Sequence, residues 1–143
     1  MKYENYLTLK FPSKEVNEEI VCSAVAAFVN QLDITLIELT NIRTAVSEAV
    51  TNCVKHAYPN KIGTITVECK ILRKHVVDIV VKDSGVGIRD IDQARQPMYT
   101  TGDTEHCGMG FSIMESFVDE LDVTSTAGCG TVVHMRKYLK SRM

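Results

Sequence analysis

Residues 46–52 read VSEAVTN and lie inside a long stretch of helical periodicity, residues 36–57. Apolar residues recur there at steps of three and four, which predicts one buried helix face. The same stretch places Glu48 one helical turn before Asn52, on a face rotated away from the apolar stripe. Taken alone, this polar row is best interpreted as a solvated face beside a core. The stripe consists of Ile42, Val46, Ala49, Cys53 and Ala57, and the row of Thr44, Glu48, Asn52 and His56.

The residues before this helix predict a strand and a first helix. YLTLKF, residues 6–11, alternates apolar and polar side chains as a strand does, and residues 15–32 have helical spacing. The following LDIT interrupts the pattern, and either Asp33 or Thr35 can cap the helix that contains VSEAVTN. Pro59 then ends that helix, since proline cannot continue it.

The second half of the chain reads as strands with one more helix. TITVECKIL (64–72) and VVDIVVKD (76–83) predict a hairpin, and the second has apolar residues on both faces, which suggests a sheet interior or a partner on one side. MGFSIMESFV (109–118) predicts a helix, and two strands follow around a glycine turn. We therefore expect a single domain over residues 1–143, an α+β fold with helices on one face of a mixed or antiparallel sheet.

Composition limits the classes of function. The chain has 143 residues and a formal net charge of -2, so it lacks the basic footprint of a nucleic-acid binder. No apolar run approaches the roughly 20 residues of a membrane helix, and the N-terminus lacks a signal-peptide core, so we expect a cytoplasmic protein. The five cysteines form no C-x-x-C pair, which favours reduced thiols over a zinc site or disulfides.

Three short motifs follow the VSEAVTN helix, and each is weak alone. DSGVG, residues 83–87, comes directly after a buried strand. It is either a β-turn or a nucleotide-binding motif. In the second case Asp83 accepts a hydrogen bond from an amino group of the nucleotide base, and the glycines let the flat base approach the backbone. GMGF, residues 108–111, opens a helix whose N-terminus could bind phosphate. Gly130 and Thr131 enter the last strand. Both the P-loop and the complete Rossmann fingerprint are missing from the sequence.

The order and spacing of these motifs resemble the ATP-binding fold shared by gyrase, Hsp90, histidine kinases and MutL, the Bergerat-type two-layer sandwich. The resemblance spans roughly residues 38–131. VSEAVTN, ARQPMYTT (94–101) and GMGFSIMESF (108–117) are similar in wording and order to the anti-sigma F factors of spore-forming bacteria, which are small serine kinases.

The resemblance implies a role for each matching residue. Glu48 is implied to be the general base, and Asn52 the Mg²⁺ ligand through its side-chain oxygen. Asp83 is implied to hold the adenine amino group of ATP or ADP, with Thr131 supporting it through water. A lid is implied over residues 95–107. The other implied nucleotide-binding residues are His56, Gly85, Gly87, Thr100, Thr101, Gly108, Met109 and Gly110.

The resemblance also implies partners. The expected protein binds a sigma F type sigma factor, phosphorylates a serine of an anti-anti-sigma antagonist, and forms a homodimer through part of its sheet, without touching nucleic acid or membrane. Two alternatives stay open: a non-catalytic nucleotide-gated binding module, and an anti-sigma kinase of a general stress response. A histidine kinase catalytic domain fits poorly, because the chain has no room for a dimerisation helix pair. Related anti-sigma kinases often carry arginine where this chain has His106.

Overall fold

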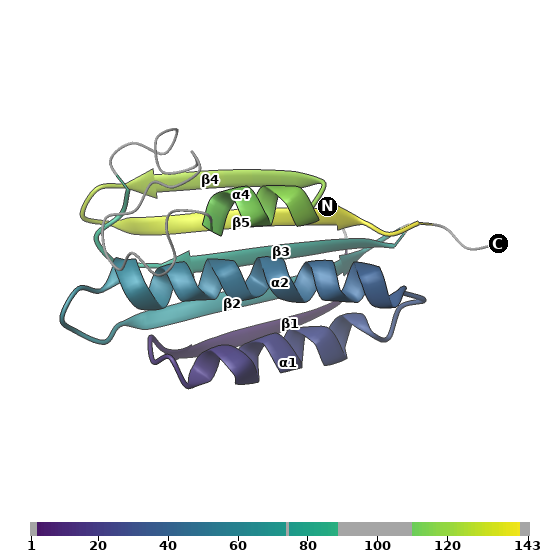
Figure 1. The fold of residues 1–143 in the computed structure, drawn as a ribbon, viewed down its shortest axis with the longest axis horizontal. Helices are drawn as coiled ribbons and strands as arrows, with labels where there is room; N and C mark the ends of the chain where they lie inside the picture. Colours follow the sequence, from purple (N-terminus) through teal and green to yellow (C-terminus); the bar gives the residue numbers. More distant parts are fainter. Residues whose placement is uncertain (1–2, 74, 89–109, 141–143) are drawn as a thin grey trace.

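Five strands form one sheet in the order β1-β2-β3-β5-β4, in which every neighbouring pair is antiparallel (Figure 1). The computed structural model describes residues 3–73, 75–88 and 110–140. β3 lies between β2 and β5, which confirms the sheet interior predicted for residues 76–83. The strands are β1 (Tyr3–Pro12), β2 (Thr64–Leu72), β3 (Val76–Asp83), β4 (Glu120–Thr126) and β5 (Gly130–Tyr138).

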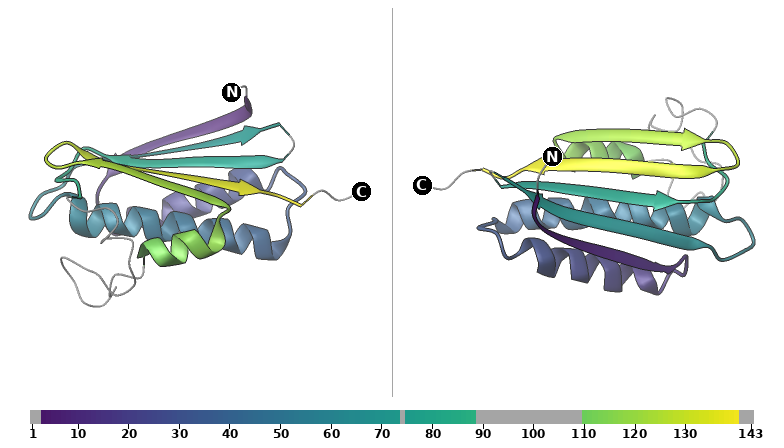
Figure 2. Two further views of the ribbon diagram at one scale, coloured as in Figure 1. Left: turned by 90° about the horizontal axis from the view of Figure 1, so that it is seen from above. Right: turned by 180° about the vertical axis from the view of Figure 1, so that it is seen from behind.

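The helices in the described ranges cover one face of this sheet, and no described helix lies on the opposite, open face (Figure 2). This arrangement confirms the predicted α+β fold, and the sheet is antiparallel rather than mixed. None of the helices in the described ranges is long and apolar enough to cross a membrane. The helices are α1 (Asn17–Val29), α2 (Leu36–Asn52), the π-helix η1 (Cys53–Ala57) and α4 (Gly110–Phe117).

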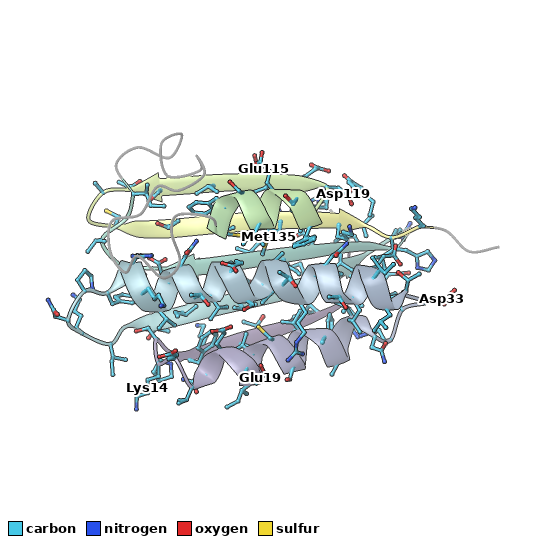
Figure 3. The ribbon with its side chains drawn as sticks, viewed as in Figure 1. Lys14, Glu19, Asp33, Glu115, Asp119 and Met135 are labelled. Carbon is cyan, nitrogen blue, oxygen red and sulfur yellow. The ribbon has the colours of Figure 1, made fainter. Side chains whose placement is uncertain are left out.

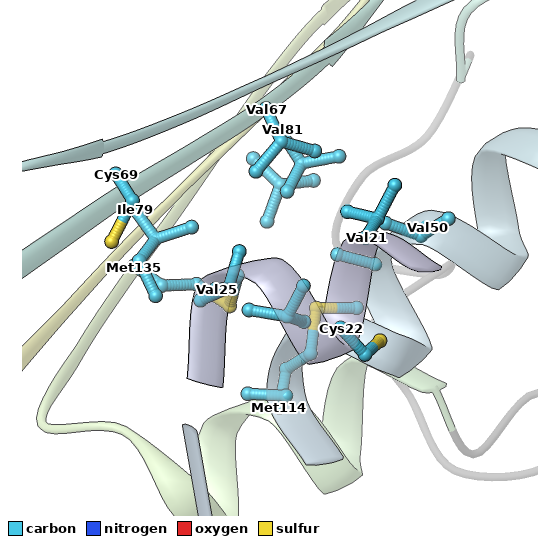
Figure 4. Packing of buried hydrophobic residues seen from close by; sticks show 14 of the residues in the cluster. Val21, Cys22, Val25, Val50, Val67, Cys69, Ile79, Val81, Met114 and Met135 are labelled. Atoms are coloured by element: carbon cyan, nitrogen blue, oxygen red, sulfur yellow. The ribbon is translucent and has the colours of Figure 1, made fainter. Parts of the chain in front are cut away.

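The core lies between the helices and the centre of the sheet. Val50 of α2, Met114 of α4 and Val25 of α1 belong to one buried cluster with Val67 and Val81 of the sheet (Figure 4). Each of these side chains is at most 1% exposed. Full burial of one such side chain stabilises the fold by about 1.5–3 kcal/mol, so this layer is the main source of stability.

The apolar stripe predicted for residues 42–57 is buried along its whole length. The helix itself ends earlier than the periodicity suggested, because α2 stops at Asn52 and the last turn is the π-helix η1. The first helix is also shorter than the predicted 15–32, and the first strand is longer than 6–11. Periodicity marks which face is buried, whereas the backbone hydrogen bonds that fix the ends depend on local geometry.

Polar contacts join α1 to α2 at the edge of the helical layer. The Arg43 guanidinium on α2 donates to the Glu19 carboxylate, whose residue Figure 3 places on α1. Beside this pair, the Ser47 hydroxyl donates to Glu18 Oε1 at 2.5 Å. The Arg43–Glu19 pair lies at the exposed edge and adds little stability, so the buried apolar faces supply most of the binding energy between the two helices.

The cysteines in the described ranges are all free thiols. Burial raises the pKa of Cys69 to about 12 and that of Cys22 to about 11, so both thiols stay protonated and unreactive at neutral pH. This agrees with the reduced thiols predicted from the sequence. Cys107 lies outside the described residues.

A capping box starts α2, and it is built on Thr35 rather than on Asp33. The Glu38 N–H donates to Thr35 Oγ1 at 3.0 Å, and the Thr35 N–H donates to Glu38 Oε1 at 3.0 Å. The other oxygen of this buried carboxylate accepts from the Lys140 N–H at 3.0 Å. The cap therefore also holds the chain that leaves β5.

Thr35→Ala should lower the free energy of unfolding by about 1 kcal/mol, because the first turn of α2 loses a side-chain acceptor. Thr40→Ala is the matched control, since it makes the same chemical change at an exposed position of the same helix. Urea denaturation measures both. Equal stability of the two variants would show that the cap is not a source of stability.

Candidate functional site

The polar row on α2 borders the core, as its rotation from the apolar stripe predicted. Thr44, Glu48, Asn52 and His56 are all half-buried. His56 belongs to η1, where the chain turns less per residue than in an α-helix, so it is displaced from the straight row. Glu48 and Asn52 both lie on the regular helix, one turn apart, so a carboxylate and an amide face the same region.

The loop after β3 lies directly against η1. The Val86 N–H donates to the Ala57 carbonyl at 2.8 Å. A Cβ on Gly85 would lie 2.1 Å from the same Ala57 oxygen, so this position has room only for glycine. The DSGVG loop and the C-terminal end of the VSEAVTN helix are therefore brought together by backbone contacts.

Both oxygens of the Asp83 carboxylate have a donor at this junction. The Gly85 N–H donates to Oδ1 at 2.9 Å, and the Cys53 thiol donates to Oδ2 at 3.3 Å. Burial raises the pKa of Cys53 well above its usual value, and the negative charge of Asp83 raises it further. The thiol therefore stays protonated and remains a donor.

Thr131 lies beside Asp83, because the two residues are paired across β3 and β5. Its hydroxyl is 2.9 Å from the Ser125 hydroxyl, which donates to the Gly130 carbonyl at 2.9 Å and accepts from the Ile88 N–H at 2.7 Å. Ser125 has a single hydroxyl proton, so when it is donated to Gly130 the Thr131 hydroxyl becomes the donor to Ser125. The Thr131 oxygen then keeps lone pairs for a water or a ligand.

Two further glycines are required where this loop meets β4 and β5. Gly130 has φ +126, and a Cβ there would lie 2.2 Å from the Asp83 carbonyl oxygen. Gly87 has φ +76, and a Cβ there would lie 2.3 Å from the Thr126 carbonyl oxygen. Both conformations favour glycine, and the missing side chains allow direct backbone contacts between the loop and strands β4 and β5.

Tyr58 links this loop to the turn before β2. Its hydroxyl accepts from the Ser84 N–H at 2.8 Å and donates to the Thr64 carbonyl at 2.7 Å. The ring lies over Gly63, where a Cβ would be 2.2 Å from the ring. Tyr58 therefore links the loop after β3 to the start of β2 by two hydrogen bonds.

α4 carries the end of the GMGF motif, Gly110 and Phe111, and packs beside α2. The described part of α4 runs from Gly110 to Phe117, inside the predicted helix 109–118, and its Phe111 and Met114 are buried against the core. α4 lies beside α2 (Figure 1). Thr100, Thr101, His106, Gly108 and Met109, together with the lid predicted over 95–107, lie outside the described residues.

The structure thus gathers Asp83, Gly85, Gly87 and Thr131 at one end of the sheet, against the last turn of the helix that carries Glu48 and Asn52. Sequence reasoning missed the contributions of Cys53, Tyr58 and Ser125. Cys53 was predicted only as a core residue, and its position next to Asn52 was the one available signal. Nothing in the sequence pattern marked Tyr58 or Ser125.

Comparison with known proteins identifies what this chain is similar to. Residues 11–137 match the model of the histidine kinase-like ATPase domain. The chain is 52% identical over 140 residues to the anti-sigma F factor of Caldanaerobacter subterraneus subsp. tengcongensis, covering 97% of both chains. It is 44% identical to the anti-sigma F factor of Bacillus cereus strain G9842, covering 96% of this chain and 94% of the relative.

Two solved structures have the same fold. The crystal structure of the RsbU and RsbW domains from Mycobacterium tuberculosis matches with a TM-score of 0.71 at 17% identity, covering 96% of this chain and 33% of that chain. The histidine kinase domain of the Erythrobacter litoralis EL346 blue-light activated histidine kinase matches with a TM-score of 0.60 at 22% identity, covering 87% of this chain and 60% of that one.

Tyr58→Phe should lower the free energy of unfolding by about 1–3 kcal/mol, because two hydrogen bonds worth about 0.5–1.5 kcal/mol each are lost while the ring stays in place. Hydrogen exchange at the Ser84 amide should become faster. Tyr6→Phe is the matched control, since the Tyr6 side chain is exposed on β1. If Tyr58→Phe is as stable as Tyr6→Phe and the Ser84 amide still exchanges slowly, the Tyr58 hydroxyl does not stabilise the loop.

Proposed function

Because this chain belongs to the anti-sigma F factors and has a histidine kinase-like ATPase domain, we propose that it sequesters a sigma F type sigma factor and uses ATP to phosphorylate a serine of its anti-anti-sigma antagonist. Membership of the family confirms the resemblance predicted from the motifs. The observation that carries the proposal is the junction of the Asp83 loop with the helix bearing Glu48 and Asn52. It brings an acceptor for a base and candidate groups for phosphate chemistry to one end of the molecule.

Asp83 is proposed to select adenine. Its carboxylate already receives one donor on each oxygen, and each oxygen can accept a second hydrogen bond. An exocyclic amino group of adenine can supply one, whereas guanine presents a carbonyl at the same place. Gly85 and Gly87 are proposed to lie against the base. The places of their missing Cβ atoms are occupied by the backbone of Ala57 and Thr126, so these glycines hold the loop that carries Asp83 close to η1 and β4. Thr131, with lone pairs free beside Asp83, is proposed to support the base through water.

The phosphates are proposed to lie between α2 and the start of α4. Gly110 begins α4, and backbone N–H groups at a helix start attract negative charge. We propose that Gly108 and Met109 before it, with Thr100, Thr101 and the lid over 95–107, complete this side. His56, half-buried in η1, is proposed to help near the phosphates.

Asn52 is proposed to hold Mg²⁺ through its side-chain oxygen. Asn52 fits this ion, because it offers a neutral side-chain oxygen at a half-buried position and Mg²⁺ prefers oxygen ligands. Mg²⁺ bound with a nucleotide takes most of its ligands from phosphate and water, so one protein oxygen is enough. When bound, the ion would neutralise charge on the phosphates.

Glu48 is proposed to be the general base for phosphoryl transfer. The serine hydroxyl of the antagonist attacks the γ-phosphorus of ATP, and the bond from that phosphorus to the β–γ bridging oxygen breaks. ADP leaves, and the Glu48 carboxylate takes the hydroxyl proton. Such a step depends mainly on positioning, which a helix supplies better than a loop. Glu48 lies one turn before Asn52, so the base faces the same region as the proposed metal ligand.

The regulatory consequence is proposed to follow from this chemistry. The nucleotide-bound protein keeps the sigma factor from RNA polymerase, and phosphorylation keeps the antagonist from releasing it.

We propose a homodimer through part of the sheet, whose open face exposes Tyr6, Val132 and Tyr138. The cytoplasmic location stays a prediction. The single-domain organisation of 1–143 also stays a prediction.

The main alternative is a binding module that is gated by nucleotide but does not transfer phosphate. Sequestration requires the Asp83 loop and the phosphate region, and it does not require a carboxylate at residue 48. The position of Glu48 beside Asn52 therefore favours the kinase. A stress-response anti-sigma kinase would have the same chemistry with a different sigma factor, and the relatives named anti-sigma F favour sporulation.

Asn52→Ala should remove most of the Mg²⁺-dependent part of ATP binding, because the metal loses its protein ligand. Asn41→Ala is the matched control, since it removes the same amide about three turns earlier on the same helix. Calorimetric titration with and without Mg²⁺ measures the difference. Equal metal dependence in the parent and Asn52→Ala would exclude Asn52 from the metal site.

Glu48→Gln should lower phosphorylation of the antagonist by about 10²–10⁴-fold, because the side chain keeps its size but cannot take a proton. Nucleotide affinity and sigma-factor binding should change little. The exposed Glu4→Gln serves as the control for loss of a negative charge. Phosphoserine formation, calorimetry and sigma-factor pull-down measure the three activities.

The outcomes of this experiment separate the alternatives. Loss of transfer alone supports the kinase. Transfer within a few-fold of the parent would show that Glu48 is not the base. A parallel fall of all three activities would make Glu48 a structural residue. A parent protein that binds ATP and sigma factor but never transfers phosphate would be the non-catalytic module.

A further inference from the structure

We propose that Cys53 is a positioning residue for base recognition: its thiol holds the Asp83 carboxylate in the orientation that reads the amino group of adenine. This inference rests on the proposed function, in which Asp83 binds the base. The 3.3 Å contact from Cys53 Sγ to Asp83 Oδ2 carries it. The two residues come from different elements, since Cys53 begins η1 and Asp83 ends β3.

The carboxylate is held from two sides. The Gly85 N–H fixes Oδ1 from the loop, and the Cys53 thiol fixes Oδ2 from the helix. One donor alone would leave the carboxylate plane free to rotate about the bond to Cβ. The two donors, a backbone N–H and a side-chain thiol, come from different elements and together define that plane. Each oxygen still has capacity for one more hydrogen bond. The donor pair therefore sets the direction in which Asp83 accepts from a ligand.

The chemistry of the thiol suits this task. Cys53 is 5% exposed, so its thiol is shielded from solvent and is 3.3 Å from the carboxylate oxygen that it donates to. Thiols are weak donors, so Cys53 can orient Asp83 without using up its capacity to accept from a base.

Cys69 provides a matched control within the same core. It is 1% exposed on β2, and burial raises its pKa too. Of the two, only Cys53 has a hydrogen bond to Asp83 among the described residues. Cys53→Ala and Cys69→Ala remove the same atoms from the same core, so both should lower stability, but only the first should affect Asp83.

The test compares two ligands that differ in a single group. ATP has the 6-amino group, and purine riboside triphosphate lacks it. Calorimetry on the full chain gives the ratio of the two affinities for the parent and each variant. The parent should prefer ATP. Cys53→Ala should reduce this preference by about three- to tenfold, the range of one ordinary hydrogen bond. Cys53→Ser should restore it, because the hydroxyl is again a donor, and Cys69→Ala should leave it unchanged.

The outcomes distinguish failure of the inference from failure of the proposed function. Equal affinity of the parent for both ligands would overturn the assignment of Asp83 to adenine, and the inference with it. A parent that prefers ATP, with the ratio unchanged in Cys53→Ala, would overturn the role of Cys53 alone. A ratio that Cys53→Ser fails to restore would show that packing, and not the donor, matters. If Cys53→Ala does not fold, Cys53→Val, which fills the space without a donor, takes its place.

Discussion

The packing of α2 on the centre of the sheet is the constraint on which the rest of this structure depends. Ile42, Val46, Ala49 and Val50 are each at most 1% exposed, and their burial fixes the rotation of the helix. With that rotation fixed, Glu48 and Asn52 can lie only at the border of the helical layer. If the apolar residues stood at other positions of α2, the helix would be rotated, and these two polar side chains would face the core or the solvent.

The second constraint is the direct backbone contact between the loop after β3 and its neighbours, which fixes the position of that loop. The loop of residues 83–87 contacts η1 through Ala57 and contacts β4 through Thr126, and glycines at these contacts admit no side chain. Tyr58 then ties the same loop to the turn before β2. Such contacts are rigid, because neither partner can change rotamer. The carboxylate of Asp83 therefore lies at a rigid junction of η1, β3 and β5.

The open face of the sheet is organised by charge rather than by apolar packing. Asp78 lies on this face of β3, is nearly buried, and pairs with His134 at 2.6 Å and Arg136 at 2.9 Å on the neighbouring strand. A carboxylate at low exposure requires such partners. The two faces thus have different roles: the helical face buries the core and carries the candidate site, while the other presents a polar surface with a few exposed aromatic residues.

The sequence by itself determined the elements and the residue types of the candidate site. Periodicity identified the buried stripe of α2. Alternation identified β1 and β2, an apolar run identified β3, and a glycine turn separated β4 from β5. Motif order pointed to Glu48, Asn52, Asp83 and Thr131. These are local patterns, and each can be read within a few residues. Only the tertiary structure decided that Cys53 and Tyr58 would contact the loop after β3, across sequence separations of 30 and 26 residues. It also decided the π-turn at 53–57 and the place of β5 beside β3. The physical reason is that a hydrogen bond between distant residues exists only after the core has packed and set the distance between them.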